Sequence, residues 1–191
     1  MALNAKNIKQ IRKIKALALD GDGVIFTGHM LEGGDGPIAK IRSHADGQGI
    51  SLLRASGMKI ACVTGESGAH AAFLKRLVEK WNNLPSVKDG HWPPVALFTG
   101  VERMGKVKIV EQWLKKNNLS LSECAAMGDD LTDYDILKSV GFSSAPAQAE
   151  EVIKKVVHYV VPRRGGDGAI RDLANLILKY QGIDPTSLLL R

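Results

Sequence analysis

The sequence predicts an α/β fold in which a mainly parallel β-sheet carries helices on both faces. Short apolar runs alternate along the chain with segments of helical periodicity, as they do in βαβ units. With 191 residues, 45% of them hydrophobic, the chain can bury a core as one domain, which we expect to span residues 1–191. Polar residues directly follow several of the apolar runs, at the strand ends where open α/β sheets bind ligands.

The first predicted strand, residues 14–19, is followed by two carboxylates, Asp20 and Asp22, with one glycine between them. Two like charges side by side are costly unless a cation neutralises them. Aspartate and glycine are also the usual residues of polar turns. This pair alone therefore leaves both interpretations open, a reactive site and a simple turn.

A β-hairpin is predicted over residues 24–36, directly after the carboxylates. The apolar run after Asp22 leads to a glycine-rich turn at residues 33–36. It could be a simple exposed hairpin, but an isolated hairpin is only marginally stable in water. We therefore expect the chain to form an oligomer.

The later elements follow the same pattern of apolar run and polar end. Residues 59–66 and 124–133 each read as an apolar strand that ends in polar groups, and a helix is predicted over residues 105–114. The polar groups at their ends are Thr64, Gly65, Glu66, Lys106, Asp129, Asp130 and Asp133. Taken singly, Thr64 fits a helix cap and Lys106 a solvated side chain, so only the order in which these groups occur along the chain can indicate a site.

The remaining segments are two loops, a helix and a tail. Residues 82–100 are rich in proline and are expected to form an extra loop, in which His91 and Trp92 could reach a substrate or a partner subunit. A basic, glycine-rich loop spans residues 163–168, and a helix over residues 169–180 follows it. The tail spans residues 182–191, and its apolar end is expected to be disordered or docked on a neighbour.

Composition excludes several classes of function. The net charge is +6, but the basic residues are scattered along helices, which argues against nucleic-acid binding and suits anionic substrates. No apolar run is long enough to cross a membrane, and the N-terminus lacks the apolar stretch of a signal peptide. The two cysteines, Cys62 and Cys124, lie in predicted strands and indicate buried thiols. We therefore expect a cytoplasmic protein without a membrane partner.

Four motifs occur in the order Asp-x-Asp, Thr, Lys, Asp-Asp, and this order resembles the haloacid dehalogenase superfamily of phosphotransferases. Within it, the chain resembles the capless sugar-acid phosphatases that act on 3-deoxy-D-manno-octulosonate 8-phosphate or on nonulosonate 9-phosphates. The segments that carry this narrower resemblance are Asp20-Gly21-Asp22-Gly23-Val24, Asp46-Gly47-Gln48-Gly49-Ile50, Thr64-Gly65-Glu66, Gly128-Asp129-Asp130-Leu131-Thr132-Asp133 and Gly165-Gly166-Asp167-Gly168-Ala169-Ile170-Arg171. The resemblance implies a Rossmann-like sheet without a cap domain, a homotetramer joined through the hairpins, and a place in lipopolysaccharide biosynthesis.

The resemblance also implies a chemistry. Asp20 would be the nucleophile and Asp22 the general acid and base. Mg2+ would be held by Asp20, Asp129 and the main-chain carbonyl of Asp22, because hard cations prefer oxygen ligands. Other members of the site would be Lys106 as a neutralising charge, Thr64 and Gly65 as donors to the phosphoryl group, and Asp130 and Asp133 as groups that orient the ligands.

The substrate is less determined than the chemistry. Glu66 and Asp167 resemble the enzymes of nine-carbon acids, whereas Thr27 and Ala45 depart from the patterns of the family. The substrate carboxylate could be bound by Arg163, Arg164 or Arg171, although Arg171 could equally pair within the last helix.

Two further hypotheses stay open at this point. One is a non-catalytic, phosphatase-like module that holds an oligomer together. The other is a phosphatase of the same mechanism that acts on an unrelated phosphate ester.

Overall fold

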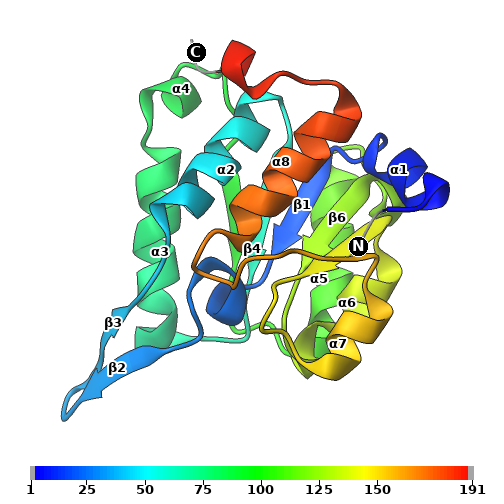
Figure 1. The fold of residues 1–191 in the computed structure, drawn as a ribbon. Coiled ribbons are helices and arrows are strands. Elements are labelled where there is room, and N and C mark those ends of the chain that lie inside the picture. Colours follow the sequence, from blue (N-terminus) through cyan, green and yellow to red (C-terminus); the bar gives the residue numbers. More distant parts are fainter. Residues whose placement is uncertain (1–2, 189–191) are drawn as a thin grey trace.

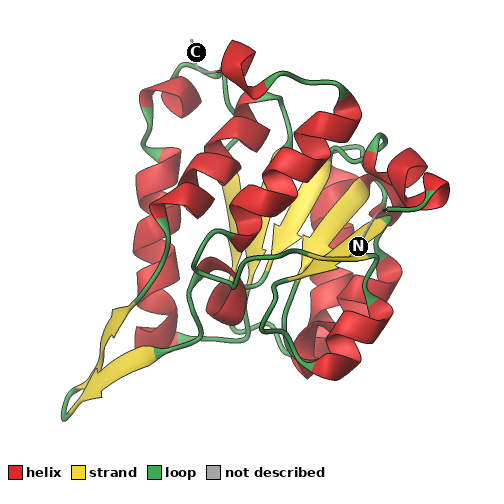
Figure 2. Ribbon diagram, in the orientation of Figure 1, coloured by secondary structure: helices red, strands yellow, loops and turns green. Residues whose placement is uncertain are grey.

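The computed structural model describes residues 3–188 and has the predicted α/β architecture (Figure 1, Figure 2). Its main sheet has six strands in the order β5-β4-β1-β6-β7-β8, and every neighbouring pair in it is parallel. The antiparallel pair β2-β3 forms a separate hairpin. The strands are β1 (Ala16–Leu19), β2 (Met30–Gly33), β3 (Gly36–Lys40), β4 (Lys59–Val63), β5 (Val95–Phe98), β6 (Cys124–Met127), β7 (Phe142–Ala145) and β8 (Tyr159–Val160).

Helices cover both faces of the main sheet (Figure 2). The helices are α1 (Ala5–Ile11), α2 (His44–Ala55), α3 (Gly68–Asn82), α4 (Pro85–Lys88), α5 (Arg103–Lys116), α6 (Tyr134–Ser139), α7 (Glu151–Val156) and α8 (Ala169–Gln181). Buried side chains of α2, α3 and α8 belong to one core cluster, and those of α5, α6 and α7 belong to another. The chain is therefore layered as helices, sheet and helices.

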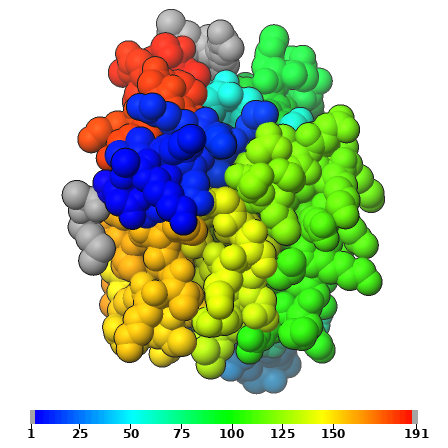
Figure 3. Space-filling view, turned by 90° about the vertical axis from the view of Figure 1, so that its right-hand side faces the viewer, coloured from blue at the N-terminus to red at the C-terminus, as the bar shows by residue number. Residues whose placement is uncertain are grey.

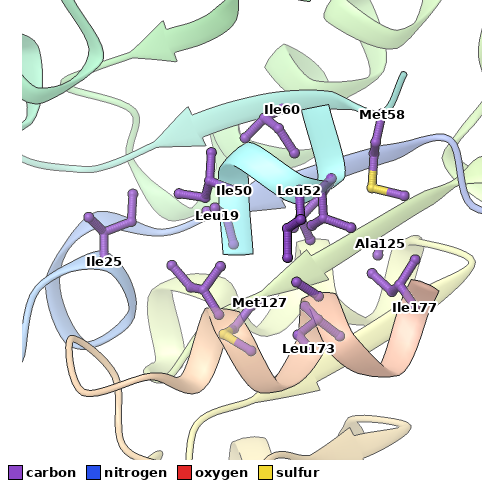
Figure 4. Packing of buried hydrophobic residues seen from close by; sticks show 14 of the residues in the cluster. Leu19, Ile25, Ile50, Leu52, Met58, Ile60, Ala125, Met127, Leu173 and Ile177 are labelled. Atoms are coloured by element: carbon purple, nitrogen blue, oxygen red, sulfur yellow. The ribbon is translucent and has the colours of Figure 1, made fainter. Parts of the chain in front are cut away.

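The two core clusters lie on opposite faces of the sheet because side chains alternate along each strand. In β1, Leu17 and Leu19 belong to one cluster, whereas Ala16 and Ala18 belong to the other. Figure 4 shows the first cluster, in which Leu19 packs between α2 and α8. This packing fixes the position of β1 along its own axis. The residues that follow the end of β1 are therefore fixed as well.

The hairpin begins later than the sequence predicts. Residues 24–36 were expected to form it, but residues 21–25 make a tight turn, closed by the N–H of Phe26 on the carbonyl of Gly21 over 3.0 Å, and the hairpin consists of β2 and β3. The backbone turns at Gly23, whose φ of 73° is readily adopted only by glycine. The apolar residues that follow it are all buried rather than alternately exposed, so they belong to the core. Within residues 3–188, the insertion after β1 is this hairpin, with no cap domain.

The segment 82–100 is more ordered than the expected loop, since it contains α4 and the edge strand β5. The side-chain amide of Asn82 accepts from and donates to the backbone of Val95, over 2.8 and 2.9 Å. The buried guanidinium of Arg54 donates to the carbonyl of Pro93 over 2.8 Å. These partners are distant in sequence, which is why local composition predicted only a loop.

The last points of the fold concern the lengths of the helices, the hairpin and the C-terminal tail. No helix within residues 3–188 is long and apolar enough to cross a bilayer. The hairpin projects from the body of the molecule, at the end opposite the C-terminal segment (Figure 1, Figure 3). Of the apolar tail, Leu188 is buried, and residues 189–191 lie outside the described residues.

Candidate active site

A cleft of about 500 Å3 opens at the carboxyl ends of the central strands. Neighbouring strands β4, β1 and β6 run parallel and in matched register, so the residues that follow them meet at one edge of the sheet. The predicted site residues that line this cleft are Asp20, Asp22, Thr64, Gly65, Glu66, Lys106, Asp129 and Asp130. A larger groove of about 600 Å3 lies beside Ile14 and Tyr180, and its lining contains no carboxylate.

Lys106 joins two carboxylates at the floor of the cleft. Its Nζ donates to Asp20 Oδ1 and to Asp133 Oδ1, each over 2.7 Å. The Lys106 side chain is only 3% exposed, so the ammonium has exchanged water for these two partners. Burial lowers the pKa of Lys106, but the charges of Asp20 and Asp133 outweigh it and leave that pKa raised. Lys106 is therefore a fixed positive charge beside Asp20.

Asp133 organises the loop that follows β6. Its Oδ2 accepts from the backbone N–H groups of Asp129 and Asp130, over 3.0 and 3.4 Å, while its Oδ1 accepts from Lys106. A Cβ at Gly128 would overlap the Asp133 side chain, so this close approach requires glycine. Both oxygens of Asp133 are thus hydrogen-bonded to neighbouring groups of the cleft.

The cleft contains donors suited to a hard metal ion. Asp20, Asp129 and Asp133 offer oxygens that lie within 4.8 Å of one another. Burial and the Asp133 carboxylate raise the pKa of Asp20 to about 8, and burial, Asp133 and Asp130 raise that of Asp129 to about 7. When all three carboxyl groups are ionised, they face a single ammonium and leave an excess of two negative charges, which a bound cation would offset. A divalent cation with a preference for oxygen ligands, such as Mg2+, fits this set.

Asp22 is bound differently from the other carboxylates. Lys40 Nζ donates to Asp22 Oδ1 over 2.8 Å and to Oδ2 over 2.6 Å. The Lys40 side chain is 3% exposed, and its ammonium lies 5.6 Å from the centre of the Phe26 ring. Sequence reasoning missed Lys40, because nothing in a basic residue on a hairpin strand indicates an inward partner.

The predicted phosphate-binding group lies at the end of β4. Thr64 is buried, and its Oγ1 accepts from the backbone N–H of Glu66 over 3.2 Å, which leaves the hydroxyl hydrogen free to donate. Glu66 lies at the mouth of the cleft with 40% of its side chain exposed, 3.7 Å from His70. The local bend therefore presents both polar residues to the cleft.

The predicted arginines do not line this cleft. Arg163 donates through Nε and Nη2 to Asp172 Oδ1, over 2.9 and 2.6 Å, because the first turn of α8 supplies that carboxylate. Arg164 lines a separate cavity of about 350 Å3, together with Arg42 and Asp167. Arg163 and Arg164 therefore lie outside the lining of this cleft, and their contact with the substrate carboxylate stays a prediction.

The backbone of Arg171 is held by Asp46, whose Oδ1 accepts from the Arg171 N–H over 3.0 Å. Asp46 Oδ2 accepts from the N–H of Gly168 over 2.9 Å, so this buried carboxylate orders the glycine-rich loop. Gln148, which sequence reasoning missed, donates to the carbonyl of Gly23 and accepts from the N–H of Gly165. Together these contacts fix the loop against the turn that follows Asp20.

Comparison with known proteins identifies similar hydrolases and phosphatases. The family of haloacid dehalogenase-like hydrolases matches residues 51–172. The 3-deoxy-D-manno-octulosonate 8-phosphate phosphatase of Yersinia pestis is 30% identical over 174 residues, covering 91% of this chain and 84% of that protein.

Solved structures agree with the sequence comparison. The phosphatase of the same name from Moraxella catarrhalis, in complex with magnesium, phosphate and KDO, superposes with a TM-score of 0.79 and 28% identity, covering 93% of this chain and 92% of that one. The cobalt-bound phosphatase of Haemophilus influenzae gives a TM-score of 0.79 and 25% identity, covering 95% of this chain and 99% of that one.

Proposed function

The chain belongs to the haloacid dehalogenase-like hydrolases and is a phosphomonoesterase, and we propose that it hydrolyses the phosphate ester of a 3-deoxy-2-keto sugar acid with Mg2+ as cofactor. The substrates in question are octulosonate 8-phosphate, for which its relatives are named, and nonulosonate 9-phosphates. The observation that carries the proposal is Lys106, held between Asp20 and Asp133 beside Asp129 in one cleft.

Asp20 is the nucleophile in this account. One oxygen of its carboxylate attacks phosphorus, the bond between phosphorus and the sugar oxygen breaks, and an aspartyl-phosphate forms. Asp22 donates a proton to the departing sugar oxygen. Lys106, the Thr64 hydroxyl and the Gly65 N–H stabilise the charge that develops on the phosphoryl oxygens.

Water completes the reaction. Asp22, now a carboxylate, accepts a proton from the water that attacks phosphorus, the bond to Asp20 breaks, and inorganic phosphate leaves. Asp20, Asp129 and the main-chain carbonyl of Asp22 would hold Mg2+, which supplies positive charge to the phosphoryl group when it is bound. Asp130 and Asp133 orient these groups, and Asp133 does so through its three hydrogen bonds.

The proposal includes a homotetramer joined through its hairpins. Leu31 and Ile38 on the hairpin, and Ile41 directly after it, are 60%, 58% and 64% exposed. Large apolar side chains gathered on one projecting element favour burial against another subunit. The N–H of Thr27 donates to the carbonyl of Ile41 over 3.0 Å, so the hairpin has a fixed connection to the body that such a contact could use.

A reducing cytoplasm is the proposed location. Cys62 and Cys124 are free and buried, and burial raises the pKa of each thiol to about 12, so neither is a reactive thiolate. The substrate named for the relatives would place the protein in the synthesis of lipopolysaccharide sugars.

The test is phosphate release with Mg2+ from octulosonate 8-phosphate, a nonulosonate 9-phosphate and a panel of common sugar phosphates. A kcat/KM at least about 100-fold higher for one sugar-acid phosphate than for the panel supports the proposal. Equal turnover of every ester would retain the chemistry and reject the substrate class. No turnover by folded, metal-loaded protein would favour the alternative of a non-catalytic oligomerisation module.

A further inference from the structure

The pair of Lys40 and Asp22 connects the projecting hairpin to the catalytic cleft. Lys40 is the last residue of β3, whereas Asp22 lies in the turn after β1 and lines the cleft. The ammonium binds both oxygens of the carboxylate, over 2.6 and 2.8 Å. Resting on the proposed function, we infer that Lys40 is a positioning residue, which holds the carboxyl group of Asp22, protonated for this step, in the orientation needed for proton transfer to the leaving oxygen.

The surroundings of Lys40 support this role. Its side chain is only 3% exposed, and the Phe26 ring lies beside the ammonium at 5.6 Å. A charged group that has lost water needs a partner, and Asp22 is the carboxylate bonded to it. The pair is therefore a fixed contact and differs from a mobile surface ion pair.

The geometry of the contact leaves Asp22 able to react. A carboxylate has about four lone-pair positions, and the ammonium occupies one on each oxygen. The remaining positions are open, and 33% of the Asp22 side chain is exposed. A charge-assisted contact to both oxygens restricts rotation of the carboxylate while leaving it open to the cleft.

The hairpin therefore sets the direction of Asp22, because the side chain of Asp22 has this partner on β3, outside the main sheet. Misplacement of a proton donor penalises poor leaving groups most, since a good leaving group departs without a proton. This distinction separates a positioning role from a general loss of structure.

The experiment compares kcat/KM for ethyl phosphate and for p-nitrophenyl phosphate, with Mg2+, in wild type, Lys40→Met, Lys40→Arg and Asp22→Asn. Lys40→Met is expected to lower kcat/KM for ethyl phosphate about 100-fold and for p-nitrophenyl phosphate less than about 3-fold. Lys40→Arg, which keeps two donors and the charge, is expected to recover most of the loss. Lys15→Met is the matched control, because Lys15 pairs with Glu123 at the surface.

A double variant tests whether Lys40 acts through Asp22. Adding Lys40→Met to Asp22→Asn is expected to cause no further loss, since Asp22→Asn already removes the proton donor that Lys40 positions. Where Lys40→Met fails to fold, Lys40→Gln serves in its place. Equal losses on both esters, additive losses in the double variant, or undiminished hydrolysis of ethyl phosphate by Lys40→Met would overturn the inference.

Failure of the proposed function looks different. In that case the wild type hydrolyses neither of these esters and no sugar-acid phosphate, or Asp22→Asn shows no preference for the good leaving group. If Asp22→Asn shows that preference and Lys40→Met does not, only the role of Lys40 is rejected.

Discussion

Replacing Lys106 by Met removes the charge that joins Asp20 to Asp133 while keeping the length of the side chain. Each contact of 2.7 Å is worth about 6 kcal/mol at an effective dielectric constant of about 20, before the cost of desolvation. Breaking a buried ion pair by removing one partner destabilises proteins by about 3–5 kcal/mol. We therefore expect the free energy of unfolding to fall by about 3–5 kcal/mol at pH 8 without divalent metal.

The loss depends on pH in a direction that follows from the carboxylates. Burial already raises the pKa of Asp20 to about 8, and removing Lys106 raises it further. A carboxyl group whose pKa is raised in the folded state contributes stability that is present at low pH and lost as pH rises through that pKa. The cost of Lys106→Met is therefore expected to shrink as pH falls from about 8 to about 5.

Urea denaturation in EDTA, followed by far-UV circular dichroism, measures both quantities. Lys108→Met is the control, because Lys108 lies on the same helix and is exposed. A loss equal to that of Lys108→Met, or a loss that does not change with pH, would refute the electrostatic reasoning.

Three further predictions follow from the same contacts. Because the pKa of Asp129 is raised to about 7 and that of Asp20 to about 8, Mg2+ competes with protons for these carboxylates. The affinity for Mg2+, measured by calorimetry, is therefore expected to rise from about pH 6 to about pH 9, and a constant affinity would contradict the assigned ligands. Gly128→Ala is expected to displace Asp133 and to lower kcat more than about 10-fold, with wild-type kcat as the contrary result. Ile38→Lys is expected to dissociate the oligomer in sedimentation velocity, and an unchanged mass would remove the hairpin from the interface.

Much of the site could be predicted because its residues follow strand ends directly. Asp20, Thr64 and Asp129 come after β1, β4 and β6, and parallel strands bring their carboxyl ends to one edge. The order of motifs therefore mapped onto one cleft without knowledge of any contact between distant residues. Lys106 was placed by the same logic, from the start of a helix that packs behind the sheet.

Some charge pairs could not be predicted, because they depend on how the elements pack. Arg163 was expected to bind the substrate carboxylate, and the first turn of α8 supplies it with a partner, Asp172. Nothing in the sequence singles out Lys40, which the hairpin directs inward to Asp22. Periodicity reports which side of an element is apolar and does not report which charge lies opposite.

The predicted start of the hairpin was wrong for a local reason. The apolar run after Asp22 has the composition of a strand, but the left-handed conformation of Gly23 turns it into the core. Composition alone could not separate these outcomes, because both bury apolar side chains.

The central claim is that Asp20 attacks phosphorus, and the most direct measurement is phosphate release with Mg2+ by wild type, Asp20→Asn and Asp89→Asn. Asp89 is an exposed carboxylate on the segment 82–100 and serves as the matched control. The account predicts that Asp20→Asn remains folded and loses at least about 1,000-fold in kcat/KM for p-nitrophenyl phosphate, while Asp89→Asn matches wild type. An Asp20→Asn protein that keeps kcat/KM within about 10-fold of wild type would contradict it.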